Sequence, residues 1–161
     1  TLDNGLAALP HDERLLYARG LLRERADRVE EALADFRTLV EANPDNPVYL
    51  NAYGYTLADR TDRYDEALVL IERALALDPD DVATTDSMGW VLFKLKRHDE
   101  ALVHLRRAYA AQPDGEIAAH LGEVLWVTGD HDEARQILRK AHADDSENRV
   151  LQRTIERLKP W

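Results

Sequence analysis

The stretch from Ser87 to Pro113, SMGWVLFKLKRHDEALVHLRRAYAAQP, recurs along the chain at intervals of 33 to 35 residues. Each copy contains a glycine and, further on, an acidic pair followed by an alanine. The glycines are Gly20, Gly54, Gly89 and Gly122, and the alanines are Ala32, Ala67, Ala101 and Ala134. Self-similarity at this period indicates an array of repeated supersecondary units, and it takes precedence over any local pattern.

The composition suits a helical array with a large acidic surface. The 161 residues are 45% hydrophobic and 32% charged, which allows a buried core. The net charge of −10 argues against general nucleic-acid binding, which requires a basic stripe, and against an anionic membrane surface. No apolar run approaches the roughly 20 residues that span a bilayer. The lack of cysteine excludes disulfides, thiolate metal sites and cysteine nucleophiles, and it leaves the compartment open.

Apolar residues at helical spacing run through the chain, and no segment has the alternation of a strand. Pairs of helices are expected at residues 12–25 and 28–42, 48–59 and 64–77, 82–95 and 99–111, and 116–128 and 132–143, with a last helix at about 148–158. Pro10 lies 34 residues before Pro44. Residues 1–10 are therefore expected to be the remnant of the second helix of a preceding repeat, in a chain cut from a longer protein. A private N-terminal cap is the alternative.

Gly89, Ala101 and Pro113, at steps of 12 residues, resemble the tetratricopeptide repeat, and Gly20, Ala32 and Pro44 have the same spacing. The resemblance implies an all-α fold, a right-handed α-solenoid of helix-turn-helix repeats that ends in a C-terminal capping helix. It places repeats at residues 11–45, 46–80, 81–114 and 115–147, and the capping helix at 148–161. In such arrays one helix pair cannot bury its apolar face alone, so stacking of pairs supplies the core.

A second resemblance involves longer stretches around three of the glycines. GYTLADRTDRYDEAL (54–68), DSMGWVLFKLKRHDEAL (86–102) and EIAAHLGEVLW (116–126) are similar to the C-terminal part of large bacterial repeat lipoproteins. Those proteins lie in the periplasm at the outer membrane, and some are adaptors for a carboxy-terminal processing protease. The resemblance implies a fragment of such a lipoprotein, in that location, with a protease as a candidate partner.

In these arrays the first helices of the pairs line the concave face, so the resemblance implies a row of partner-binding residues around the glycines. The implied residues are Tyr17, Leu21, Asn51, Tyr55, Asp86, Trp90, Ala119 and Glu123, with Phe93 and Trp126 one turn further on. Aromatic side chains are favoured anchors because they bury much area at low entropic cost. Packing against a neighbouring repeat is the alternative for Phe93 and Trp126, and also for Tyr55 and Trp90. We expect a protein or peptide partner with an apolar or basic segment.

The same row argues against one known mode of binding. Repeat proteins that grip the acidic C-terminal tails of chaperones place Lys, Arg and Asn there, and only Asn51 matches. Asp86 and Glu123 would repel a terminal carboxylate, so a carboxylate clamp is not expected. The alternative to partner binding is an architectural role, in which the array self-associates, for example through an exposed N-terminal repeat edge, and the groove is empty.

No metal site, cofactor or catalytic site is expected. His120 and Glu123 are one helical turn apart, but a zinc site needs three or four converging ligands. His98 and His131 occupy equivalent turn positions where packing is ordinary, and His104 is expected on an exposed face. No nucleophile elbow, phosphate loop or dinucleotide fingerprint is present. The sequence therefore predicts a binding protein and not an enzyme.

Backbone strain is predicted in one turn between paired helices. Gly129 occupies this turn in the fourth pair, and Lys96 stands in the equivalent place in the third pair. If the turn requires a positive φ, Lys96 carries a steric cost of about 1 kcal/mol. Replacement of Lys96 by glycine is then predicted to raise the stability of the protein.

Overall fold

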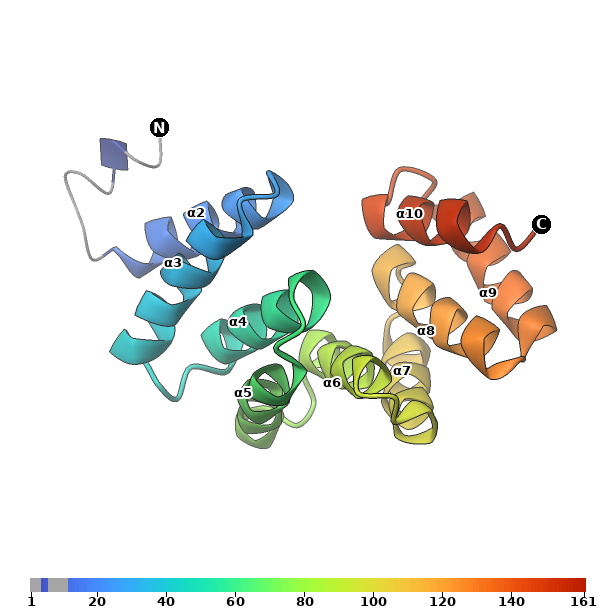
Figure 1. Cartoon of the computed structure of the whole chain (residues 1–161), viewed down its shortest axis with the longest axis horizontal. Coiled ribbons are helices and arrows are strands. Elements are labelled where there is room, and N and C mark those ends of the chain that lie inside the picture. The colour runs from blue at the N-terminus through green and yellow to red at the C-terminus, as the bar shows by residue number, and fades with distance from the viewer. Residues whose placement is uncertain (1–3, 6–11) are drawn as a thin grey trace. The chain divides into compact units, whose positions relative to one another are not determined.

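Helices that follow one another along the chain pack side by side in pairs (Figure 1). The computed structural model describes residues 4–5 and 12–161, and within those ranges every regular element is a helix. The chain divides into two compact units, Thr1–Pro79 and Asp80–Trp161. The expected helical remnant at residues 1–10 lies outside the described residues, apart from Asn4 and Gly5, which are helical.

The first unit consists of two helix pairs. Its helices are α2 (Glu13–Arg25), α3 (Val29–Ala42), α4 (Pro47–Arg60) and α5 (Tyr64–Leu77). The second unit consists of two further pairs and a single helix. These are α6 (Val82–Lys94), α7 (His98–Ala111), α8 (Gly115–Thr128), α9 (His131–Asp144) and α10 (Arg149–Leu158). The observed ends lie within one residue of those predicted from the sequence, so the all-helical expectation is confirmed.

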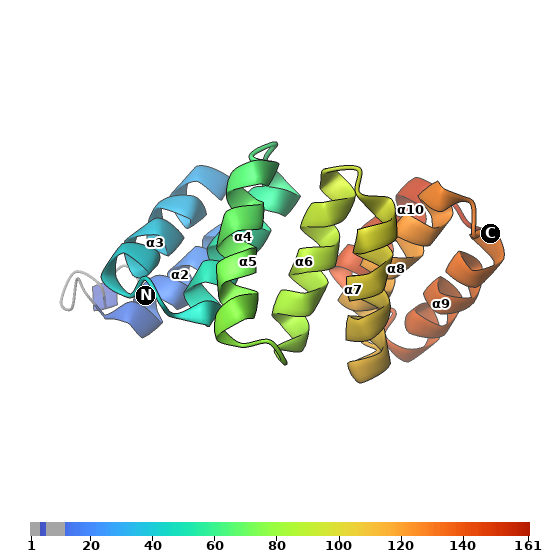
Figure 2. The ribbon, with the colours of Figure 1, turned by 90° about the horizontal axis from the view of Figure 1, so that it is seen from below.

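Within each pair the glycine of the first helix lies against the second helix, as the sequence predicts. A Cβ atom added to Gly89 would lie 2.5 Å from Cγ of Leu105 and 3.1 Å from the carbonyl oxygen of Ala101. A Cβ atom on Gly122 would lie 2.7 Å from Cγ of Leu138. Ala101 and Leu105 are fully buried. The small residues therefore set the close approach of paired helices such as α6 and α7, which Figure 2 shows side by side.

The first helix of each pair begins in the same way, and so does α10. The residue before each of these helices is an aspartate or asparagine whose side chain accepts backbone N–H bonds from the first turn, which stabilises a helix start. These N-caps are Asp12, Asn46, Asp81, Asp114 and Asn148. We call α2, α4, α6 and α8 the first helices, and α10 shares their starting register.

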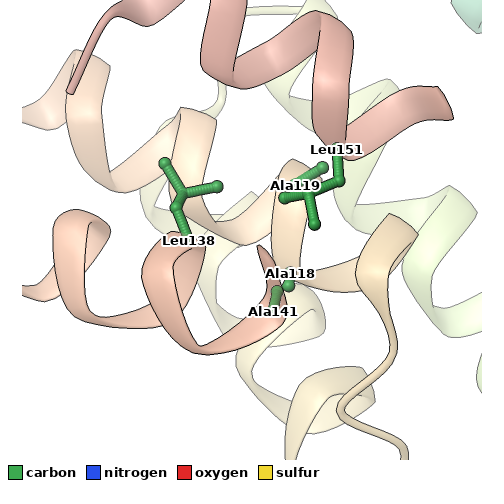
Figure 3. Packing of buried hydrophobic residues seen from close by; sticks show 5 residues of the cluster. All are labelled: Ala118, Ala119, Leu138, Ala141 and Leu151. Atoms are coloured by element: carbon green, nitrogen blue, oxygen red, sulfur yellow. The ribbon is translucent and has the colours of Figure 1, made fainter. Parts of the chain in front are cut away.

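The capping helix α10 closes the apolar end of the second unit. Figure 3 shows Leu151 of α10 beside Ala119 of α8, with Leu138 and Ala141 of α9 in the same buried cluster. Leu151 and Leu138 are completely buried. Partly buried Val150, Ile155 and Leu158 pack around this cluster. One face of α10 is thus fixed against α8 and α9, and the opposite face is left at the surface.

Three of the turns between paired helices contain a residue with a positive φ. Lys96 has a φ of 64°, and Gly129 in the fourth pair has a φ of 99°. Asp27, in the first pair, has a φ of 63°. Positive φ values are costly for residues with a Cβ atom. The positive φ considered for Lys96 is therefore confirmed, and the gain in stability on its replacement by glycine stays a prediction.

Candidate partner-binding surface

The predicted binding residues follow a simple rule in the structure. On each first helix, two of them lie five and nine residues after the N-cap, and we call these positions the row. They are Tyr17 and Leu21 on α2, Asn51 and Tyr55 on α4, Asp86 and Trp90 on α6, and Ala119 and Glu123 on α8. Positions four residues apart lie on the same side of a helix.

In the first unit the row is half-buried and forms a mainly aromatic surface. Tyr17, Leu21, Asn51 and Tyr55 all retain part of their exposure. The Tyr17 ring lies 6.2 Å from the ring of Phe36 and 5.8 Å from that of Tyr49, measured between centroids. Burial raises the pKa of the Tyr17 hydroxyl.

A polar rim accompanies these tyrosines. The hydroxyl of Tyr49 donates a hydrogen bond of 3.1 Å to Glu13, whose carboxylate also accepts a bond of 2.7 Å from the Asn43 amide. The Oδ1 atom of Asn51, by contrast, makes no such hydrogen bond, since it is buried without a donor among the described residues. An amide oxygen of this kind costs about 1–3 kcal/mol when it is left unsatisfied. The row of the first unit therefore combines apolar area with one unsatisfied acceptor.

In the second unit the row is buried, and for Trp90 this is the alternative of packing against a neighbouring repeat. Trp90 is only 4% exposed. Its ring stacks on His120 with centroids 4.2 Å apart, lies 5.3 Å from the ring of Phe93, and has the Lys94 ammonium over it at 4.6 Å. Ala119 is completely buried as well. The surface of Trp90 that was predicted for a partner is therefore already covered by α8 and by its own helix.

The two acidic row residues of the second unit have internal partners. Oδ2 of Asp86 lies 2.8 Å from Nδ1 of His120, and the other carboxylate oxygen of Asp86 is buried without a donor among the described residues. Both oxygens of Glu123 accept bonds of 2.6 Å from the Arg157 guanidinium on α10. The charge of Glu123 is thus offset by Arg157, so the repulsion expected of it is weaker than the sequence suggested.

The two aromatic residues beyond the row pack within their own helix pairs. Phe93 is buried, with its ring 5.5 Å from that of His98. Trp126 is half-buried, with its ring 4.3 Å from that of His131 and the Arg135 guanidinium 5.2 Å away over its face. The turn histidines make the ordinary packing contacts that the sequence predicts.

The histidines do not assemble a metal centre in the described part of the chain. No group of three or more potential ligands occurs there, and His120 and Glu123 contact different partners. His104 is half-buried and not exposed as expected. Its burial, followed by the nearby charge of Arg107, lowers its pKa. Among the described residues, none of the helices has the length and apolar character needed to cross a bilayer.

Sequence reasoning missed several charged residues that the structure brings into play. Asp35 is buried and accepts bonds of 2.6 Å from Arg19 and 2.7 Å from Arg23, which ties α3 to α2. On α10, Arg153 and Arg157 lie five and nine residues after the N-cap Asn148, so they occupy row positions. The glycine that marked the row elsewhere is replaced by Glu156. The recurring N-cap would have located them.

Comparisons with known proteins agree with this geometry. Models of the tetratricopeptide repeat match residues 2–47, 17–82, 54–116 and 92–158. A TPR repeat-containing protein of Pseudomonas aeruginosa is 45% identical over 98% of this chain, which spans 27% of the length of that relative.

Solved structures show the same fold at lower identity. A thermophilic TPR protein of Thermus thermophilus superimposes with a TM-score of 0.83 at 23% identity, covering 99% of this chain and 88% of that chain. The type IV pilus biogenesis factor PilW superimposes with a TM-score of 0.76 at 21% identity, over 99% of this chain and 76% of that one. The all-α solenoid predicted from the sequence is thereby confirmed. With its paired helices, its glycine–alanine contacts and family models that match almost from end to end, this chain belongs to the tetratricopeptide repeat family.

Proposed function

We propose that this chain is part of a scaffold that binds a polypeptide partner through the row of its first unit. Tetratricopeptide repeat proteins are generally non-catalytic scaffolds, and the fold is consistent with protein–protein interaction. The observation that carries the proposal is a difference in exposure. Tyr17, Leu21, Asn51 and Tyr55 are half-exposed, whereas Asp86, Trp90, Ala119 and Glu123 are buried.

The chemistry of this surface favours an apolar segment that also carries basic residues. Tyrosines supply a large contact area with little loss of side-chain entropy. Residues 1–79 contain 16 acidic and 9 basic residues, so a basic segment is attracted to this unit. The partner binds as a helix or an extended peptide that inserts one apolar anchor between the row residues.

We further propose an adaptor role in the periplasm of a bacterium, at the outer membrane, with a carboxy-terminal processing protease as one partner. The support is the resemblance of residues 54–68, 86–102 and 116–126 to large bacterial repeat lipoproteins. The identity of 45% with the Pseudomonas aeruginosa relative is consistent with a bacterial source. The function of a complete protein of that length is part of the proposal.

Site-specific photocrosslinking tests the binding surface. A benzoylphenylalanine in place of Tyr55 is expected to capture a polypeptide in cells of the native source. The same group in place of Val69, which is 59% exposed on α5, is the control. Capture of the same polypeptide from both positions would contradict a specific surface at Tyr55. Capture of a second copy of this chain from Tyr55 would favour the architectural role.

Affinity measurements with the purified protease test the adaptor role. Tyr55→Ala is expected to weaken binding by about tenfold or more, as is typical of an aromatic anchor. The control is Tyr64→Ala, which removes a half-buried tyrosine from α5. Equal affinity of the native chain and Tyr55→Ala, with helicity retained, would place the contact elsewhere. No binding of the protease by the native chain would remove the protease assignment alone.

A further inference from the structure

Three arginines lie along the outer side of α10. Arg149, Arg153 and Arg157 are spaced four residues apart, which places them on one side of the helix, and all three are exposed. We call them the arginine row. Arg153 and Arg157 occupy the row positions of the capping helix, in register with Ala119 and Glu123 of α8.

The stability of α10 does not explain this arrangement. Arg149 is the first residue of the helix, where the helix dipole disfavours a positive charge. Like charges four residues apart also repel one another along a helix. The helix is held instead by its opposite face, where Leu151 and Thr154 are buried. A charge pattern that opposes the local rules is typical of a functional surface.

Within the arginine row, Arg157 is charge-compensated by Glu123, whereas Arg149 and Arg153 are not compensated by any described residue. Arg157 is fixed by its two bonds of 2.6 Å to Glu123, although 54% of its side chain stays exposed. Within the described ranges, no carboxylate pairs with Arg149 or Arg153. Residues 149–159 contain four basic residues and one acidic residue, in a chain with a net charge of −10. The arginine row is therefore a local basic surface on an acidic protein.

We propose that the arginine row binds an acidic, extended segment of a partner polypeptide. Successive arginines are spaced about 6 Å along the helix axis, from a rise of roughly 1.5 Å per residue. Alternate side chains of an extended peptide are spaced about 6.8 Å on one face. Carboxylates two residues apart in such a peptide therefore match Arg149 and Arg153, and arginine forms paired hydrogen bonds to carboxylates.

The charge of the rest of the chain selects a short peptide over a larger polyanion. The arginine row is about 12 Å long, from the same helical rise. At physiological salt, charges farther away than about 8 Å are largely screened, so a peptide of this length feels mainly the arginines. A nucleic acid or an anionic bilayer extends well beyond them. Outside residues 149–159, the part of the chain from 80 to 161 contains 14 acidic and 8 basic residues, so its net negative charge would repel the excess length.

This surface is independent of the function proposed above. It belongs to the second unit and takes an acidic segment, whereas the row around Tyr55 belongs to the first unit and takes an apolar or basic one. Failure of either experiment leaves the other proposal standing.

Fluorescence anisotropy with the whole chain tests the proposal. The probe is a fluorescein-labelled peptide of alternating glutamate and glycine, and the matched probe has glutamine in place of glutamate. The native chain is expected to bind the glutamate peptide alone, and added salt should weaken binding. Arg149→Glu/Arg153→Glu should weaken it by about tenfold or more, as expected for lost charge-assisted hydrogen bonds. Because glutamate suits a helix start, this variant is expected to fold.

A control variant with the same change of charge separates a site from general attraction. Arg107→Glu/Lys140→Glu alters two exposed cations on α7 and α9 and is expected to change the affinity by less than about twofold. Equal weakening by the two variants would overturn the proposal, as would no binding of the glutamate peptide. Arg153→Gln provides a milder test if the double variant is unfolded. If phosphatidylglycerol vesicles or an oligonucleotide bound more tightly than the glutamate peptide, the assignment of a polypeptide partner would be overturned.

Discussion

The Nδ1 atom of His120 lies 2.8 Å from Oδ2 of Asp86, and both side chains are buried at the contact between α6 and α8. Asp86 therefore joins two successive first helices. The stacking of Trp90 on His120 belongs to the same contact. Trp90, a row residue of the second unit, thus contributes to the packing between helix pairs.

Removal of this carboxylate should destabilise the second unit. In Asp86→Ala the buried imidazole of His120 loses the hydrogen bond to Asp86, and we expect a loss of about 3 kcal/mol in the free energy of unfolding. Urea denaturation followed by circular dichroism measures this. Glu72→Ala, at an exposed position of α5, is the control and should change the stability by less than about 0.5 kcal/mol. Equal effects of the two substitutions would show that the contact contributes nothing.

The strained turn predicts a gain in stability. Lys96→Gly relieves a residue at a φ of 64° and should stabilise the protein by about 1 kcal/mol, seen as a higher Tm. Gly129→Ala, at a φ of 99°, is the reverse experiment and should lower the Tm although its Cβ atom meets no neighbour. A lower Tm for Lys96→Gly would mean that contacts of the lysine outweigh the strain.

Because paired helices approach each other closely, a methyl group added at the glycine contact should destabilise the protein. Alanine has the higher helix propensity, worth about 1 kcal/mol over glycine in a helix interior. In Gly89→Ala the new atom would lie 2.5 Å from Cγ of Leu105, so we expect a net loss of about 2 kcal/mol. A thermal melt compares it with Ala110→Ser on the exposed side of α7. A stabilised Gly89→Ala would show that Leu105 can move away.

Burial of His104 predicts a dependence of stability on pH. Its folded-state pKa is lowered, chiefly by desolvation, so the unfolded chain binds a proton more readily. The stability associated with neutral His104 is fully present above the unfolded pKa of about 6.5 and is lost as the pH falls through the folded pKa. His104→Gln should flatten the fall in Tm between pH 7 and pH 5. An unchanged slope would exclude His104 as a contributor.

The sequence predicted the helices well because backbone and packing constraints recur in the local pattern. Gly89, Ala101 and Pro113 mark a close contact, a buried helix position and a helix end, and each is readable from residue type and spacing. The positive φ at Lys96 was predicted for the same reason, from the glycine that stands in the equivalent turn.

The exposure of the row was less predictable, because a residue from another helix pair decides the burial of Trp90. Tyr55 and Trp90 occupy the same position after their N-caps, yet one is half-exposed and the other is covered by His120. The ion pair of Glu123 with Arg157 joins two residues that are 34 positions apart, one on the first helix α8 and one on the capping helix α10. Whether these residues bind a partner stays a prediction.

Asparagine or aspartate caps begin α2, α4, α6, α8 and α10, whereas α3, α5, α7 and α9 have no side-chain cap. A gene segment duplicated from one cap to the next would therefore encode a complete helix pair with its glycine and its two row positions in phase. The array can gain or lose such units in evolution without redesign of its joints. Only the surface residues would then need to diverge to change what is recognised.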